Sequence, residues 1–86
     1  MISLSPISIE KARAYFAEHS AYRGEFNIAI AAADEKGLHG VIALVADGDK
    51  FSLGHVSTDG NAQVGSLLYG GAWRTAKAMG YACVWI

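Results

Sequence analysis

The sequence predicts an α+β fold with the element order β-α-β-β-β-α-β, in which the sheet is mostly antiparallel and one parallel β-α-β pair lies at the C-terminal end. The turn sequences DEKG at 34–37 and DGDK at 47–50 separate three runs rich in apolar residues and therefore predict a three-stranded meander. Two further stretches repeat apolar residues every three or four positions, which is typical of amphipathic helices. The apolar stretch from Tyr81 to Ile86 then predicts a final strand, parallel to the strand before the second helix.

A short extended stretch, residues 1–5, opens the chain, and a helix is predicted after it. Ser8 is placed to cap this helix, which is expected to run through Glu18 or His19. Residues 19–25 contain a glycine and mixed charges and predict a loop. The helix is expected to turn four side chains toward the core: Ile9, Ala12, Tyr15 and Phe16.

Three strands are predicted between the helices. Phe26, Ile28 and Ile30 alternate with smaller or polar residues, so these three side chains are expected on one face of the sheet. The second strand covers residues 39–46, because this run is apolar and rich in β-branched side chains. The third covers residues 51–58 and leads into the second helix.

The second helix is predicted from about Gln63 to Met79, with Gly80 at the position where a left-handed residue ends a helix. Asp59, which precedes Gly60 at the strand-to-helix turn, is expected to cap it. One stripe of the helix is expected to pack on the sheet and consists of Val64, Leu67, Leu68, Gly71, Ala72, Thr75, Ala76 and Met79.

Length and composition restrict the class of protein. A chain of 86 residues predicts one domain, 1–86, because so short a chain buries only about 60–65% of its unfolded surface. Seven Lys and Arg against eight Asp and Glu give a net charge near −1, which argues against direct nucleic-acid binding. The apolar runs are too short and too interrupted by glycine for a membrane span, and a single cysteine, Cys83, forms no internal disulfide. With no signal-peptide pattern at the N-terminus, a cytoplasmic protein is expected.

Three segments carry a resemblance to a known family: STDGNA (57–62), LLYGGAWR (67–74) and AKAMGY (76–81). They resemble a small family of GNAT-superfamily acetyltransferase-like proteins, common in phages and bacterial genomes, in which a TDG turn precedes an LYGAAWRAAKAxGY helix. The stretch from Pro6 to His19 looks similar too. The resemblance implies a GNAT-like fold that is truncated at its C-terminus. It also implies that acetyl-CoA lies between two splayed parallel strands, with its pyrophosphate on the backbone N–H groups at the start of the central helix. The positions that match are Asn61, Ala62, Gln63, Val64, Gly65 and Ser66.

This sequence departs from the superfamily pattern at the residues that carry its chemistry. In the R/Q-x-x-G-x-G/A loop, Gly60 replaces the leading Arg or Gln and Gln63 replaces the middle glycine, where a side chain obstructs close approach of a phosphate. The superfamily also continues past this last strand, whereas the sequence ends at Ile86. His55 is the only candidate for a general base in the preceding strand, and a structural role is favoured for it. No metal site is expected, because His19 and His39 lack the spacing of paired ligands.

Three pairs of residues are candidates for partner contacts. Tyr22 and Arg23 are expected to be exposed in the loop after the first helix, and Tyr and Arg are common interface anchors. Tyr69 and Trp73 lie four apart on the second helix, where the sequence leaves open whether they fill the edge of the core or form a contact surface. Trp85 and Ile86 lie on the predicted terminal strand, whose unpaired edge is expected to pair with a second copy, giving a dimer, or with another protein.

Together these observations favour a truncated GNAT-fold protein that lacks catalysis and acts by protein-protein binding. The expected setting is a phage or mobile-element inhibitor of a host defence complex, of the anti-CRISPR kind, with a host or phage protein complex as partner. Such a protein requires no cofactor. Two alternatives stay open, because a retained fold does not establish function: an acetyl-CoA-dependent N-acetyltransferase completed by dimerisation, and a remnant that binds CoA without turnover.

Overall fold

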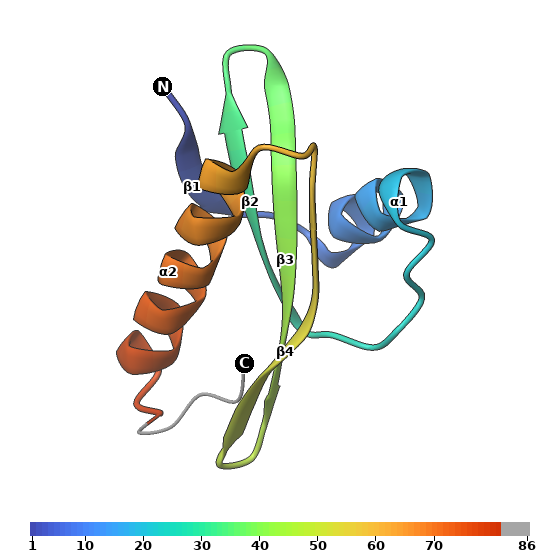
Figure 1. Cartoon of the computed structure of the whole chain (residues 1–86). Coiled ribbons are helices and arrows are strands. Elements are labelled where there is room, and N and C mark those ends of the chain that lie inside the picture. Colours follow the sequence, from blue (N-terminus) through green and yellow to red (C-terminus); the bar gives the residue numbers. More distant parts are fainter. Residues whose placement is uncertain (82–86) are drawn as a thin grey trace.

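The computed structural model describes residues 1–81, apart from the side chain of Ala62. Its elements are, in chain order, β1 (Ser3–Pro6), α1 (Ile9–His19), β2 (Ile28–Asp34), β3 (Gly37–Asp47), β4 (Lys50–Thr58) and α2 (Ala62–Ala78). The four strands form one sheet in the order β1-β2-β3-β4, and each neighbouring pair is antiparallel. α1 lies on one face of this sheet and α2 on the other (Figure 1).

This architecture confirms the predicted α+β class and the predicted order of the first six elements. The predicted parallel strand at 81–86 lies outside the described residues, except for Tyr81, which has no regular secondary structure. The GNAT topology in its full form therefore stays a prediction.

Both predicted hairpins are present, each with a two-residue loop. Asp34 pairs with Gly37 in the first hairpin and Asp47 pairs with Lys50 in the second. Gly37 has φ +126° and Gly48 has φ +59°, conformations that glycine adopts without the steric penalty of a Cβ. The three strands of the meander are thus joined by local turn chemistry.

The ends of α1 follow from short-range hydrogen bonds. Ser8 is the N-cap, as predicted, and its hydroxyl accepts a hydrogen bond from the Lys11 N–H at 3.1 Å. At the other end, the N–H of Ala21 donates to the carbonyl of Phe16 at 2.6 Å. Ala21 has φ +57°, so an alanine occupies a left-handed position that usually belongs to glycine.

The C-terminal end of α2 agrees with the prediction, whereas its N-terminal end differs from it. The N-cap is Asn61, whose side-chain oxygen accepts from the Gln63 N–H at 2.9 Å, so the expectation that Asp59 caps this helix is wrong. The C-terminus ends as predicted, because Gly80 has φ +91°. The Tyr81 N–H donates to the carbonyl of Ala76 at 2.9 Å, which completes the usual glycine-ended motif.

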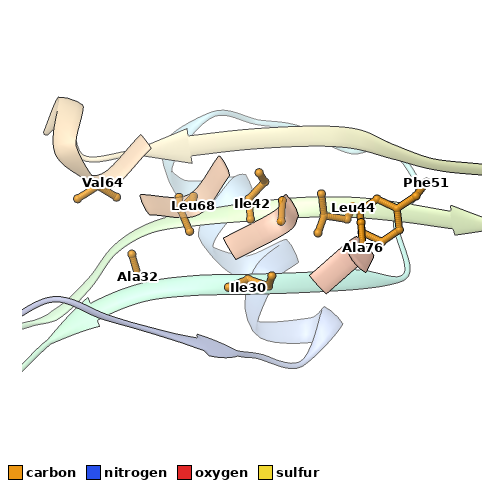
Figure 2. Close-up of a cluster of buried hydrophobic side chains, with 9 residues drawn as sticks. Ile30, Ala32, Ile42, Leu44, Phe51, Val64, Leu68 and Ala76 are labelled. Atoms are coloured by element: carbon orange, nitrogen blue, oxygen red, sulfur yellow. The ribbon is translucent and has the colours of Figure 1, made fainter. Parts of the chain in front are cut away.

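Two apolar clusters, one on each face of the sheet, hold the helices in place. The cluster under α2 is shown in Figure 2 and consists of Ile30, Ala32, Ile42, Leu44, Phe51, Val64, Leu68, Ala72 and Ala76. The cluster under α1 consists of Ala12, Tyr15, Phe16, Phe26, Ala29, Ala31, Val41 and Ala43. Successive residues of β2 and β3 alternate between the two clusters, as the period of a strand requires. The predicted stripe of α2 is confirmed at its buried positions, which are Val64, Leu68, Gly71, Ala72 and Ala76. Leu67 and Thr75 are only half-buried, and Met79, the C-cap, is 50% exposed.

Phe26 lies on the opposite face from the one predicted. It packs in the cluster under α1, whereas Ile30 packs under α2. The reason is that β2 begins only at Ile28, so the alternation does not extend back to Phe26. Before β2, the side chain of Asn27 makes the hydrogen bonds to β3 that a strand backbone would make. Its amide donates to the Ala46 carbonyl at 2.8 Å, and its oxygen accepts from the Ala46 N–H at 2.9 Å.

α2 approaches the sheet closely at Gly40 of β3. A methyl group on Gly40 would lie 2.7 Å from Val64 Cγ1 and 3.1 Å from Leu68 Cδ1. Val64 and Leu68 are fully buried, so neither side chain has free space into which to retreat. The first two turns of α2 can therefore pack this closely on the sheet because Gly40 has no side chain.

We expect Gly40→Ala to lower the free energy of unfolding by about 1–3 kcal/mol, since it overpacks the contact with Val64. Gly65→Ala is the matched control. A Cβ at Gly65 meets nothing within 4 Å, and alanine in a helix is favoured over glycine by about 1 kcal/mol, so this variant should be more stable. Urea unfolding of both variants measures the difference, and equal effects of the two would contradict the close contact.

A second expectation concerns Ala21. Replacing Ala21 by glycine should raise the free energy of unfolding by up to about 1 kcal/mol, because the left-handed backbone at φ +57° strains an alanine. Ala17→Gly, inside the exposed side of α1, should have the opposite sign and cost about 1 kcal/mol. Loss of stability in Ala21→Gly would show that the backbone there is not left-handed in solution.

Candidate functional site

A bulge in β3 brings three ionisable side chains together beside the first hairpin. The pairing of β2 with β3 steps from Ala32 with Gly40 to Ala33 with Leu38, which leaves His39 without a partner in β2. The His39 ring lies between the carboxylate of Asp34, at the end of β2, and that of Asp59, just after β4. Nδ1 is 2.6 Å from Asp59 Oδ2, and Nε2 is 2.8 Å from Asp34 Oδ1 in an ion pair poorly aligned for a hydrogen bond.

The two carboxylates favour the protonated imidazole. A neutral imidazole has only one N–H, and a carboxylate only accepts, so both contacts are satisfied only by the imidazolium ion. The pKa of His39 is accordingly raised, first by its hydrogen bond with Asp59 and then by its close contact with the carboxylate of Asp34. The pKa of Asp59 is lowered by His39 and then by the N–H of Asn61, and the pKa of Asp34 is lowered by His39 and then by the N–H of Lys36.

Tyr15 of α1 is the buried polar group associated with this cluster. Its side chain is 7% exposed, and its hydroxyl has no hydrogen-bond partner among the described residues. Burial raises the pKa of Tyr15, and the negative charges of Asp59 and Glu18 raise it further. The phenol therefore stays neutral, and its ring stacks on His19 with 4.1 Å between centroids.

The Asp34-His39-Asp59 cluster is suited to a structural role, in which it connects neighbouring elements. Both ring nitrogens of the imidazolium face carboxylates, so the ring has no lone pair with which to accept a proton or ligate a metal ion. Within residues 1–81, no set of three His, Cys, Asp or Glu side chains is arranged to hold a metal ion. The cluster instead fixes the end of β2 and the turn before α2 onto β3.

Sequence reasoning did not find this cluster. The sequence places His39 at the start of a predicted strand and predicts Asp59 as a helix cap, and no motif connects the two residues. The available signal is the antiparallel meander itself. Its first hairpin and the end of its third strand lie at the same end of the sheet, so Asp34 and Asp59 are both expected near the start of the middle strand. The bulge at His39 leaves no mark in the sequence, and it is what turns the ring toward both carboxylates.

His55, the weak candidate for a general base, is held in an aromatic cluster under α1. Its ring stacks on Tyr22 with 4.3 Å between centroids and an interplanar angle of 5°, and it meets the edge of Phe16 at 5.1 Å. Nε2 is 3.1 Å from the hydroxyl of Ser20, which itself donates to the Phe16 carbonyl at 3.3 Å. His55 therefore donates its Nε2–H to Ser20 and joins β4 to the end of α1, an arrangement that favours a structural role.

The six positions expected to bind a cofactor form the N-cap and first turn of α2. The N–H groups of Gln63 and Val64 are already bonded to the side chain and the carbonyl of Asn61, at 2.9 and 3.0 Å. Asn61, Gln63 and Ser66 are exposed, Gly65 is half-buried and Val64 is buried in the core. A phosphate bound here would have to displace the cap, so the turn is not preformed for it.

The partner candidates occupy different environments. Tyr22 is half-buried against His55, contrary to the expectation that it is exposed, whereas Arg23 is exposed. Tyr69 and Trp73 are 38% and 45% exposed, so they lie on the surface of α2 and not in the core. Trp85 and Ile86 lie outside the described residues.

Comparisons of this chain with protein-family models, with curated proteins and with solved structures find no match. The likeness to the GNAT superfamily therefore stays a prediction that rests on the sequence segments quoted above. In the part of the chain that the structure describes, none of the helices has the length and apolar character needed to cross a membrane.

The Asp34-His39-Asp59 cluster predicts a pH dependence of stability. A raised pKa of His39 stabilises the fold fully below its ordinary value of 6.5, and this contribution is lost as the pH rises through the raised value. The lowered pKa values of Asp34 and Asp59 stabilise the fold above 3.8, and that contribution is lost as the pH falls through the lowered values. The contribution of the cluster is therefore largest between about pH 4 and about pH 6.5.

We expect the wild-type protein to lose more free energy of unfolding than His39→Gln between about pH 6 and about pH 9. Glutamine keeps a polar side chain in the bulge but does not titrate, so the difference between the two proteins isolates His39 from the other histidines. Urea unfolding at the two pH values is the measurement. The same loss in both proteins would show that His39 is not bound as an imidazolium ion.

Proposed function

We propose that this chain is a non-catalytic binding domain with a GNAT-like scaffold, and that it binds a protein with an acidic surface through one flank of α2. This aromatic flank consists of Tyr69, Trp73 and Lys77. The observation that carries the proposal is the exposure of two large aromatic side chains four residues apart on one helix, Tyr69 at 38% and Trp73 at 45%.

The aromatic flank has the composition of a contact surface. Residues four apart on a helix are neighbours, so the two rings form one continuous patch. Lys77 lies one turn further, with its Nζ 5.5 Å from the centre of the Trp73 ring. Tyr and Trp are enriched at interfaces, where they bury large rigid surfaces at low cost in conformational entropy.

Charge indicates the chemistry of the partner. α2 contains Arg74 and Lys77 but no aspartate or glutamate along its 17 residues. Opposite charges across an interface speed association and exclude wrong partners. An acidic surface around an apolar pocket is the complement of this flank, and the pocket would receive Trp73.

The scaffold supports a GNAT-like ancestry without supporting its chemistry. The order β-α-β-β-β-α, with the two helices on opposite faces, is compatible with the first part of the expected fold. The first turn of α2 is closed by Asn61, and His55 is engaged with Ser20. A protein from a phage or mobile element that inhibits a host defence complex is the setting we propose for such a domain.

Acetyl-CoA binding is the second candidate, and one observation favours it. The first turn of α2 carries no acidic residue, and Asn61, Gln63 and Ser66 are exposed there, so the positive end of the helix dipole faces solvent. The same surface would bind the pyrophosphate if the Asn61 side chain moved away. This candidate and the first are distinguished by the ligand that each requires.

We expect Trp73→Ser to weaken partner binding by roughly 30-fold, as the loss of an interface anchor worth about 2 kcal/mol. Leu38→Ser is the matched control, since Leu38 is 42% exposed but lies on β3, away from α2. Affinity capture from the native host should yield a species that Leu38→Ser retains, that Trp73→Ser loses, and that raised salt releases.

Two results would contradict the proposal. The first is capture of the same proteins by Trp73→Ser and by the wild type. The second is binding of acetyl-CoA, measured by calorimetry at roughly 1 mM ligand, where a site with a Kd near that value is half occupied. If Asn61→Ala tightened such binding, the first turn of α2 would be the functional site instead.

A further inference from the structure

A groove of about 460 Å³ opens on another side of α2, between its C-terminal half and strands β1 and β2. Its walls include Leu4, Pro6, Ile28, Ile30, Arg74 and Thr75. Neither Tyr69 nor Trp73 lines it, so the groove is separate from the aromatic flank. Its volume falls in the range of about 300–1,000 Å³ that is usual for small-molecule sites.

The groove exists because small residues of α2 face the strands here. Gly71 and Ala78 line it from the helix, and neither fills the space above Ile28 and Ile30. A methyl group on Gly71 would lie 2.8 Å from Leu4 Cδ1, so the helix and β1 are in close contact at this point. The groove is thus formed by the packing of two regular elements, not by a loop.

Among residues 1–81, Arg74 is the only charged residue that lines the groove. No carboxylate lies within ion-pair distance of it among residues 1–81. Its guanidinium lies back along the helix over two glycines: Nη1 is 3.4 Å from the position that a Cβ on Gly70 would occupy, and Nη2 is 4.0 Å from that on Gly71. The two glycines therefore leave the space in which a cation lies beside an apolar wall.

We propose that this groove binds an amphipathic carboxylate with an aliphatic body. The body would lie on the side chains of Leu4, Ile28 and Ile30, and the carboxylate would accept hydrogen bonds from the guanidinium of Arg74. The planar fork of arginine suits a carboxylate because two parallel N–H groups reach both oxygens. Charge complementarity selects an anion over a neutral or cationic guest, and the apolar walls select against a small hydrophilic anion. This inference does not depend on the proposed function, since the two surfaces share no residue.

Decanoate is the probe, titrated into the full chain while the methyl signals of Leu4, Ile28 and Ile30 are followed by NMR. Decanol, which has the same chain length without the charge, is titrated in parallel. We expect both ligands to shift these methyl signals, and decanoate to bind more tightly. Arg74→Gln should weaken decanoate binding by roughly tenfold or more, as the loss of a charge-assisted hydrogen bond, and leave decanol unchanged.

Lys77→Gln is the matched control, since it removes one positive charge from the same helix but lies outside the groove. It should leave the decanoate affinity unchanged, whereas Ala78→Phe, which narrows the groove, should weaken both ligands. Amide spectra of the three variants that superimpose on the wild type establish that each is folded.

Three outcomes would overturn the proposal. Methyl signals of the groove that stay unshifted by decanoate show that the groove is not a carboxylate site. Equal weakening in Arg74→Gln and Lys77→Gln shows only a general attraction of the chain for anions. A dimer in light scattering that decanoate does not dissociate, with groove signals that shift on dilution, shows that a second copy occupies the groove.

Discussion

Val64 packs on Gly40 of β3 at a distance that only a residue without a side chain allows. This contact brings the start of α2 onto the sheet, where the cluster under the helix includes the short side chains of Ala32 and Ala72 beside larger ones such as Leu44. A helix so close to the strands can turn only one stripe inward. Its other residues are presented on fixed sides of a rigid element, so the position of every surface on α2 depends on this approach.

Local signals account for what the sequence predicts well. The cap at Ser8, the two hairpins and the left-handed Gly80 each depend on residues within a few positions of one another. The predictions are wrong where contacts between residues distant in the sequence determine the position of a side chain. Phe26 lies on the other face because β2 begins only at Ile28, and before it the side chain of Asn27 is bonded to Ala46 of the neighbouring strand β3. Periodicity within one segment carries no information about such a contact.

The candidate sites were less predictable than the fold for the same reason. The sequence identified Tyr69 and Trp73 as a pair but could not assign them to core or surface, because both lie near the edge of the apolar stripe of α2. The sequence does not indicate that Arg74 belongs to a site, since a single arginine on a helix is usually solvated. Its place beside a groove depends on how β1 is laid against the helix, which requires the register of β1 with β2 and the contact of Leu4 with Gly71.

β1 joins the sheet along one edge through four residues, whereas β3 is paired on both sides. Segments with few paired groups and little buried surface open at low free energy. The walls of the groove therefore differ in stability: β1 opens more easily than β2 or α2. A ligand too wide for the closed groove would enter when β1 detaches locally from the sheet. The largest ligand that binds would then be set by the free energy needed to open this one short strand.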